Sequence, residues 1–226
     1  RHPHLRVSLA GIDLKHPVIA ASGTFGYGIE FEDIVHLDRL GGLVVKGLSA
    51  EPMTGNPPPR LFETPAGMLN AIGLQNIGVA ALLRELAPVY AGWRVPVVVS
   101  IIGSSPEDYG EVAARLESAD GIAGLEINIS SPNARRGGME FGQDPVAAAA
   151  VTSAVVRSTT LPVIVKLTPN VDDPRNVARA VVDAGAHALC VGNTLQAMAV
   201  DTRARRPVIG ATFAGLSGPA LKPVAL

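Results

Sequence analysis

Six short runs of apolar residues, rich in valine and isoleucine, constrain the fold of this chain more than any other feature. They lie at residues 16–22, 41–47, 95–104, 124–130, 161–170 and 187–194. Each run is apolar almost throughout instead of alternating between apolar and polar residues, which is typical of strands buried on both faces of a parallel sheet. The sequence therefore predicts six parallel strands.

Alanine-rich segments with helix start signals separate the later runs. Ser105–Pro106, Asp144–Pro145 and Asp173–Pro174 each combine an N-cap residue with a proline at the first helical position. Gly185 follows the last of these segments, in the place of the left-handed residue that ends many helices. This order of strand, polar loop, capped helix and strand predicts a parallel α/β protein. The first strand is not followed by G-x-G-x-x-G, which weakens the doubly wound, dinucleotide-binding alternative.

Polar side chains lie at or just beyond the C-terminal ends of these runs. They are Lys46, Ser100, Asn128, Lys166, Asn193 and Thr194. In a (β/α)8 TIM barrel those strand ends meet at one rim, where the active site is built. Taken singly, an asparagine or serine after a strand is more often a turn residue or a helix cap, but a lysine is almost never buried without a partner. We therefore expect a polar small-molecule site at the rim of such a barrel.

Composition and charge exclude several classes of function. The 226 residues are 47% apolar and 17% charged, which suits a single domain over residues 1–226. A net charge of −1 with scattered basic residues argues against a nucleic-acid partner. The histidines do not cluster at metal-ligand spacing, and the single cysteine, Cys190, is interpreted as a core residue. No apolar run is long enough to cross a membrane, so we expect a cytoplasmic protein without a membrane partner.

Several motifs resemble those of the dihydroorotate dehydrogenase family, in the same order along essentially the whole chain. They are ASGTFGYG (21–28), GNPPPRLFETPAGMLNAIGLQN (55–76), NISSPN (128–133), VKLTPN (165–170), GNT (192–194) and LSGPALKPVAL (216–226). The resemblance implies a (β/α)8 barrel that uses flavin mononucleotide (FMN) to oxidise dihydroorotate to orotate in pyrimidine biosynthesis. The first two motifs are most similar to the catalytic subunit of the NAD-linked bacterial branch (class 1B). That branch works with an FAD and iron–sulfur subunit, and a homodimer is compatible with the resemblance.

The resemblance also implies roles for individual residues. Ser131 matches the base that removes a proton from C5 of dihydroorotate while a hydride passes from C6 to FMN. The matches to the substrate-binding set are Lys46, Asn70, Ile72, Gly73, Leu74, Asn128, Asn133, Asn193 and Thr194. The matches to the FMN-binding set are Ala21, Ser22, Gly23, Lys46, Ser100, Asn128, Lys166, Ser217 and Gly218. Neutral amides can bind the imide and carboxylate of the substrate without adding charge, and a lysine beside the flavin can stabilise the negative charge of its reduced form.

The chain departs from the family pattern in two respects. Ser131 replaces the cysteine that is usual in the NAD-linked branch, and serine is typical of the membrane-bound branch. Because a hydroxyl is far less acidic than a thiol of pKa ~8.5, Ser131 would need a relay through Thr194, Lys166 or a water. The glycine-rich residues 135–138 that follow are suited to closing over a substrate.

The second departure concerns length. The sequence ends inside the expected sixth helix, so we expect about six of eight βα units and an incomplete C-terminal part of the barrel. Two alternatives remain open. One is another FMN-barrel oxidoreductase, of the dihydropyrimidine or tRNA-dihydrouridine type, which the asparagine set and the modest charge disfavour. The other is a non-catalytic barrel fragment.

Overall fold

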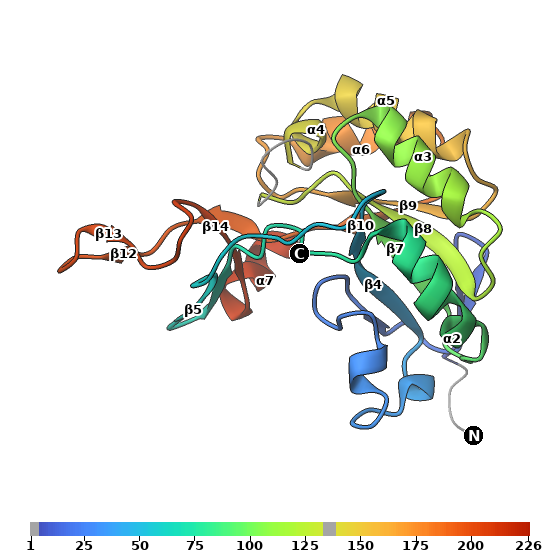
Figure 1. Ribbon diagram of the computed structural model, residues 1–226. Coiled ribbons are helices and arrows are strands. Elements are labelled where there is room, and N and C mark those ends of the chain that lie inside the picture. Colours follow the sequence, from blue (N-terminus) through green and yellow to red (C-terminus); the bar gives the residue numbers. More distant parts are fainter. Residues whose placement is uncertain (1–4, 133–138) are drawn as a thin grey trace.

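A six-stranded parallel sheet forms the centre of the computed structural model, which describes residues 5–132 and 139–226 (Figure 1). Neighbouring strands pair in the order β10-β9-β8-β7-β4-β3, and every pairing is parallel. The strands are β3 (Ile19–Ala20), β4 (Gly42–Leu48), β7 (Val97–Ile101), β8 (Ile122–Asn128), β9 (Val163–Leu167) and β10 (Ala188–Val191). All six predicted strands are therefore confirmed, and they pair in chain order as in a (β/α)8 barrel.

Helices α3 (Pro106–Leu116), α5 (Pro145–Val156) and α6 (Pro174–Asp183) cover one face of this sheet (Figure 1). Each begins as predicted, with a side-chain oxygen that accepts a hydrogen bond from a backbone N–H of the first turn. Gly185 has φ 102° and follows α6, as its predicted role requires. The other helical segments are η1 (Ile29–Phe31), η2 (Leu37–Arg39), α1 (Gly78–Ala81), η3 (Leu82–Leu86), α2 (Ala87–Ala91), α4 (Met139–Gln143), η4 (Pro219–Leu221) and α7 (Lys222–Ala225).

Alternate residues of the parallel strands contribute to two separate cores. Residues such as Val99 and Ile127 face the helices and belong to the larger core. On the other face Val44, Val98 and Ile164 form a smaller inner cluster with residues of a hairpin, β1 (Val7–Leu9) and β2 (Ile12–Leu14). Cys190 packs against this inner cluster, as predicted for a core residue, and burial raises the pKa of its thiol to about 11.

A four-stranded antiparallel sheet, which the sequence analysis did not predict, lies beyond the parallel sheet. Its strands are β11 (Leu195–Ala197), β14 (Ala214–Ser217), β6 (Gly67–Asn70) and β5 (Leu61–Thr64), in that order. The small hairpin of β12 (Val200–Asp201) and β13 (Arg206–Pro207) extends from it, away from the barrel (Figure 1). The antiparallel sheet therefore joins two segments that are far apart in the sequence.

Among residues 5–132 and 139–226, no helix is both long and apolar enough to span a bilayer. In the same ranges no group of three or more histidine, cysteine or acidic side chains is arranged to hold a metal ion.

Candidate active site

A cavity of about 680 Å³ brings together most of the predicted site residues. It lies at the C-terminal ends of the parallel strands, and residues of the antiparallel sheet form part of its wall. Its lining includes the predicted residues Ser22, Gly23, Lys46, Asn70, Ile72, Gly73, Leu74, Asn128, Ser131, Lys166, Asn193, Thr194 and Ser217. The polar residues chosen at the strand ends thus converge at one rim, as a barrel requires.

Three predicted residues lie outside the wall of this cavity. Ala21 precedes Ser22 and accepts a hydrogen bond of 2.6 Å from the hydroxyl of Thr24. Gly218 has φ 107°, and a Cβ atom there would lie 2.6 Å from the Cα of Gly67, so this glycine permits close contact between β6 and the end of β14. Ser100 is fully buried on β7. Asn133 and residues 135–138 lie outside the described residues.

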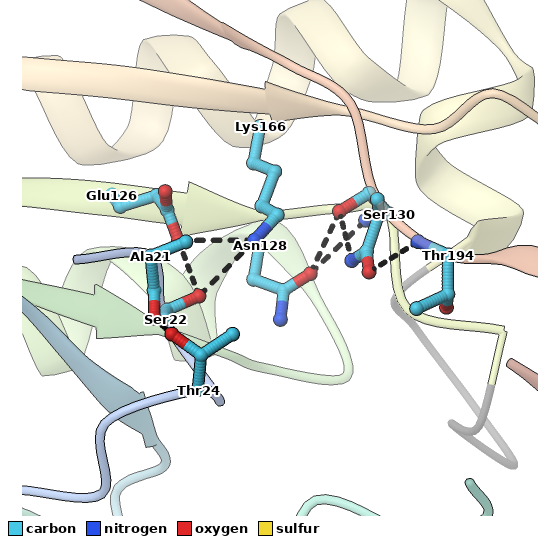
Figure 2. Close-up of polar contacts among 9 residues, drawn as sticks. Ala21, Ser22, Thr24, Glu126, Asn128, Ser130, Lys166 and Thr194 are labelled. Atoms are coloured by element: carbon cyan, nitrogen blue, oxygen red, sulfur yellow. Dashed lines mark hydrogen bonds and ion pairs between the residues drawn. The ribbon is translucent and has the colours of Figure 1, made fainter. Parts of the chain in front are cut away.

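Ser130 links two of the predicted amides in a directed hydrogen-bond chain (Figure 2). Its hydroxyl donates to Asn128 Oδ1 at 3.0 Å and accepts from Asn193 Nδ2 at 2.8 Å. Asn193 Oδ1 in turn accepts from the backbone N–H of Thr194 at 2.7 Å. These contacts fix which end of each amide is oxygen, so Asn128 keeps its Nδ2 donors for a ligand. The sequence analysis assigned no role to Ser130.

Lys166 lies beside a buried carboxylate, Glu126, that the sequence analysis missed (Figure 2). Lys166 Nζ donates to Ser22 Oγ at 3.2 Å, and that hydroxyl donates to Glu126 Oε1 at 2.8 Å. The direct distance from Lys166 Nζ to Glu126 Oε1 is 3.9 Å, and both side chains are buried. Lys166 thus has the partner that a buried lysine needs. A charged residue inside the apolar run 124–130 was the available sequence signal.

Lys46 and Arg60 place two cations on the same wall. The register between β4 and β7 shifts between Val45 and Leu48, and such an irregularity can redirect a side chain into a site. The pKa of Lys46 is lowered, first because burial disfavours the charged form and second because Arg60 repels it. Arg60 was missed because it belongs to the proline-rich loop GNPPPR (55–60) and not to the end of a predicted strand. That loop delivers Arg60 to the cavity, where Arg60 donates to Gln75 Oε1 at 2.6 Å.

Asn70 reaches the cavity from β6 of the antiparallel sheet, and Thr194 reaches it from the position directly before β11 of the same sheet. Asn70 Nδ2 donates to the carbonyl of Gly215 at 3.3 Å, which ties β6 to β14. A Cβ atom on Gly215 would lie 2.3 Å from Thr194 Oγ1, so the glycine makes room for this threonine. Asn170, also missed, donates to the carbonyl of Thr194 at 3.0 Å. The two predicted substrate residues thus depend on the same strand.

Ser131 follows the amide chain directly and is 6% exposed on the cavity wall. Its carbonyl accepts a hydrogen bond of 3.1 Å from the N–H of Met139, the first residue of α4. The predicted base is therefore buried at the same rim as the predicted substrate amides.

Another cavity, of about 730 Å³, lies at the opposite end of the sheet. Its lining includes Gly41 and Pro96, which directly precede β4 and β7. In barrel enzymes that N-terminal face serves stability, whereas catalysis takes place at the C-terminal face. We therefore place the candidate active site in the cavity of about 680 Å³.

Comparisons with known proteins agree with this arrangement. A family model described as dihydroorotate dehydrogenase matches residues 4–226. The chain is 53% identical over 224 residues to the dihydroorotate dehydrogenase B (NAD(+)) catalytic subunit of Pelobacter propionicus, covering 99% of this chain and 74% of that protein. The protein of the same name from Desulforamulus reducens is 56% identical over 223 residues, covering 99% and 73%. A putative dihydroorotate dehydrogenase A (fumarate) from Solibacter usitatus is 54% identical, covering 99% and 74%.

A solved structure shares the fold. The dihydroorotate dehydrogenase of Eimeria tenella, crystallised with ferulenol, superposes with a TM-score of 0.79 at 21% identity, covering 98% of this chain and 67% of that one. This likeness supports the partial (β/α)8 barrel inferred from the strand order. The family match over residues 4–226 and the relatives at 53–56% identity lead to one conclusion: the chain belongs to the dihydroorotate dehydrogenase family, the flavin-dependent oxidoreductases that convert dihydroorotate to orotate in pyrimidine biosynthesis.

Proposed function

We propose that this chain is the FMN-binding catalytic subunit of an NAD-linked dihydroorotate dehydrogenase, with residues 1–226 acting as one domain. The observation that carries the proposal is the convergence of asparagines, cations and Ser131 on one cavity of about 680 Å³. A ring with imide and carboxylate groups needs several fixed donors and acceptors, and these side chains can supply them. The cytoplasmic location expected from the sequence stays a prediction.

Residues in the cavity wall and directly behind it fit a flavin. Within the described ranges, Ser100 Oγ is a buried side-chain oxygen without a hydrogen-bond partner, and such a group calls for a ligand or water. Gly23 has φ 79°, and a Cβ atom there would meet nothing within 4 Å, so its backbone leaves room for a flat ligand. We assign Ala21, Ser22, Gly23, Ser100 and Lys166 to FMN, with Ser217 and Gly218 toward its phosphate side.

The amide set would bind the substrate ring. Asn128 and Asn193 are held in fixed orientations by Ser130, and Asn70 is held against β14. Lys46 and Arg60 would attract the substrate carboxylate, because an anion relieves the repulsion between the two cations. The backbone of Ile72, Gly73 and Leu74 and the predicted contacts of Asn133 and Thr194 complete the proposed substrate set.

Ser131 is proposed as the base that takes the proton from C5 of dihydroorotate. When bound, the flavin supplies the acceptor for the hydride that leaves C6, so the substrate loses one proton and one hydride in total. Burial of Ser131 keeps bulk water from its hydroxyl, and its place next to Ser130 puts it beside the substrate amides. The proton would leave through Thr194 or a water, as the low acidity of a hydroxyl requires.

The test is anaerobic flavin reduction. Purified protein with bound flavin is mixed with dihydroorotate, and the loss of the oxidised flavin absorbance is followed for the wild type and for Ser131→Ala. The variant should keep its flavin but lose most of its reduction rate, because a positioned base typically contributes about 10²–10⁴-fold. Unchanged reduction in Ser131→Ala would refute the assignment of the base.

The electron acceptor needs a separate experiment. The names of the Pelobacter and Desulforamulus relatives, each an NAD(+) catalytic subunit, favour NAD reached through a partner subunit. The family resemblance in the sequence adds that this partner would carry FAD and an iron–sulfur centre. Fumarate is the second candidate, because the Solibacter relative carries that name. Reoxidation of the reduced protein by fumarate alone, without a partner subunit, would favour the second candidate. Reoxidation that requires the added partner and NAD would favour the first.

A further inference from the structure

A buried carboxylate beneath the candidate active site has no role in the proposed function. Glu126 is 2% exposed and lies on β8. Its side chain leaves the same face of the strand as that of Asn128, because residues two apart in a strand share a face. Asn128, Lys166 and Ser22 line the cavity, whereas Glu126 does not. Glu126 therefore contacts two cavity residues from below.

Three elements surround this carboxylate. Ser22, just beyond β3, donates to Glu126 Oε1 at 2.8 Å, and Lys166 Nζ on β9 lies 3.9 Å from the same oxygen. Cys190 on β10 also faces Glu126; burial raises the pKa of the thiol most, and the charge of Glu126 raises it further. The Cys190 thiol therefore stays neutral near pH 7 and offers Lys166 no negative charge. Among the described residues, the ion pair of Lys166 is with Glu126.

The hydrogen bonds between these groups have only one consistent direction. A hydroxyl has a single proton, an ionised carboxylate only accepts, and an ammonium only donates. Since Ser22 Oγ gives its proton to Glu126, it must accept from Lys166. The chain from Lys166 through Ser22 to Glu126 thus holds a charged lysine at a defined place. Without the carboxylate, the ammonium would be an uncompensated buried charge, which is strongly unfavourable.

We propose that Glu126 is a positioning residue that keeps the Lys166 ammonium charged and directed at the flavin, and so tunes the redox potential of the flavin without contacting it. The inference rests on the proposed flavin role of Lys166 and Ser22, and it adds the group that sets the charge there. A fixed positive charge stabilises a reduced, negatively charged flavin more than a neutral amine does.

The test is the midpoint potential of the bound flavin, measured between about pH 6 and pH 9. The variants are Glu126→Gln, Lys166→Met and the double variant, with Glu111→Gln, an exposed carboxylate on α3, as the matched control. Lys166→Met should lower the potential relative to wild type at every pH. Glu126→Gln should match or exceed wild type at the acidic end, because a negative charge is lost while the lysine is still charged, and should fall toward the Lys166→Met value at the alkaline end, because an ammonium without its carboxylate partner is an unpaired buried charge.

The double variant should lie no lower than Lys166→Met, since the loss of Glu126 lowers the potential only through the lysine. Glu126→Asp, which keeps the charge, should restore the wild-type pH profile. A Glu126→Gln potential that runs parallel to wild type at all pH values, or a loss that adds to that of Lys166→Met, would overturn the proposal.

A second measurement separates this inference from the proposed function. If Lys166→Met leaves the flavin potential unchanged, the flavin role of Lys166 is wrong. Wild type, Glu126→Gln, Lys166→Met and the double variant form a double-mutant cycle. Their free energies of unfolding by urea, measured without flavin, give the interaction energy of the pair alone. A coupling between Glu126 and Lys166 in that cycle supports the charge-holding role of Glu126, and additive unfolding free energies contradict it.

Discussion

Asn193 Nδ2 donates a hydrogen bond of 2.8 Å to Ser130 Oγ, and this contact makes a buried serine the link between two proposed substrate amides. Ser130→Ala removes one acceptor for Asn193 and one donor to Asn128 in a buried site. Such a loss costs about 1–3 kcal/mol, so orotate should bind about tenfold more weakly or worse. Titration of the flavin spectrum with orotate measures this change.

The control for this substitution is Ser158→Ala. The Ser158 hydroxyl also bonds within the protein, to the carbonyl of Ala154 at 2.8 Å, but it lies after α5 and does not line the cavity. Orotate affinity should be unchanged in this control. Equal orotate affinity in Ser130→Ala and wild type would show that the two amides do not depend on the hydroxyl.

Ser131→Cys tests the base by its acidity. A thiol of pKa ~8.5 ionises far more readily than a hydroxyl, so the variant should retain dihydroorotate-dependent flavin reduction and extend it to lower pH. Stopped-flow reduction across a pH series measures the shift. An identical pH profile for the serine and cysteine proteins would mean that another group takes the proton.

Lys46 should take up a proton when orotate binds. Its pKa is lowered in the free protein by burial and by Arg60, and a bound carboxylate would raise it again. Orotate affinity should therefore fall as pH rises from the pKa of Lys46 in the free protein toward its pKa in the complex. Calorimetry in two buffers of different ionisation enthalpy, on the alkaline side of neutrality, measures the proton uptake.

Lys46→Met should abolish that proton uptake. The control is Lys15→Met, at an exposed lysine directly after β2, and it should leave the uptake intact. Lys46→Met should also raise the free energy of unfolding of the ligand-free protein. A depressed lysine pKa makes folding less favourable below the folded-state pKa, and this penalty disappears as pH rises above the unfolded-state value. Urea unfolding at neutral pH measures the gain, and a loss of stability in Lys46→Met would contradict it.

Gly218→Ala should damage the cavity more than Gly11→Ala, although both glycines have positive φ, 107° and 84°. Both variants pay for the strained backbone, about 1 kcal/mol or more each. Only at position 218 would the new Cβ meet a neighbour, the Cα of Gly67 at 2.6 Å, whereas Gly11 has nothing within 4 Å. Flavin retention and orotate binding should fall in Gly218→Ala and persist in Gly11→Ala. Equal values in the two variants would show that ligand binding does not depend on the β6–β14 contact.

Local signals explain why the parallel sheet and its helix starts could be predicted. Uninterrupted apolar runs report burial on both faces, and a serine or aspartate before proline reports a helix start, whatever the rest of the chain does. The antiparallel sheet lacked such signals. Its pairing of Asn70 with Gly215 joins residues 145 positions apart, so only the folded structure reveals it.

The same distinction holds within the candidate site. Lys166 could be chosen from its position at a strand end, because a buried lysine needs a partner, but only the structure identifies that partner as Glu126. Arg60 could not be found in this way, because its placement depends on contacts with the Asn56 carbonyl and Gln75 rather than on a local pattern. A proline-rich stretch of this kind is typical of an ordinary surface loop.

The placement of β14 against β6 also has a consequence for biosynthesis. A ribosome makes Asn70 and its neighbours early, but the strand that holds them is among the last described parts of the chain to be made. A nascent chain can therefore build the parallel strands and their helices before this wall of the candidate site exists. Flavin and substrate should become tightly held only after residues 214–217 have left the ribosome, so synthesis itself delays the first turnover.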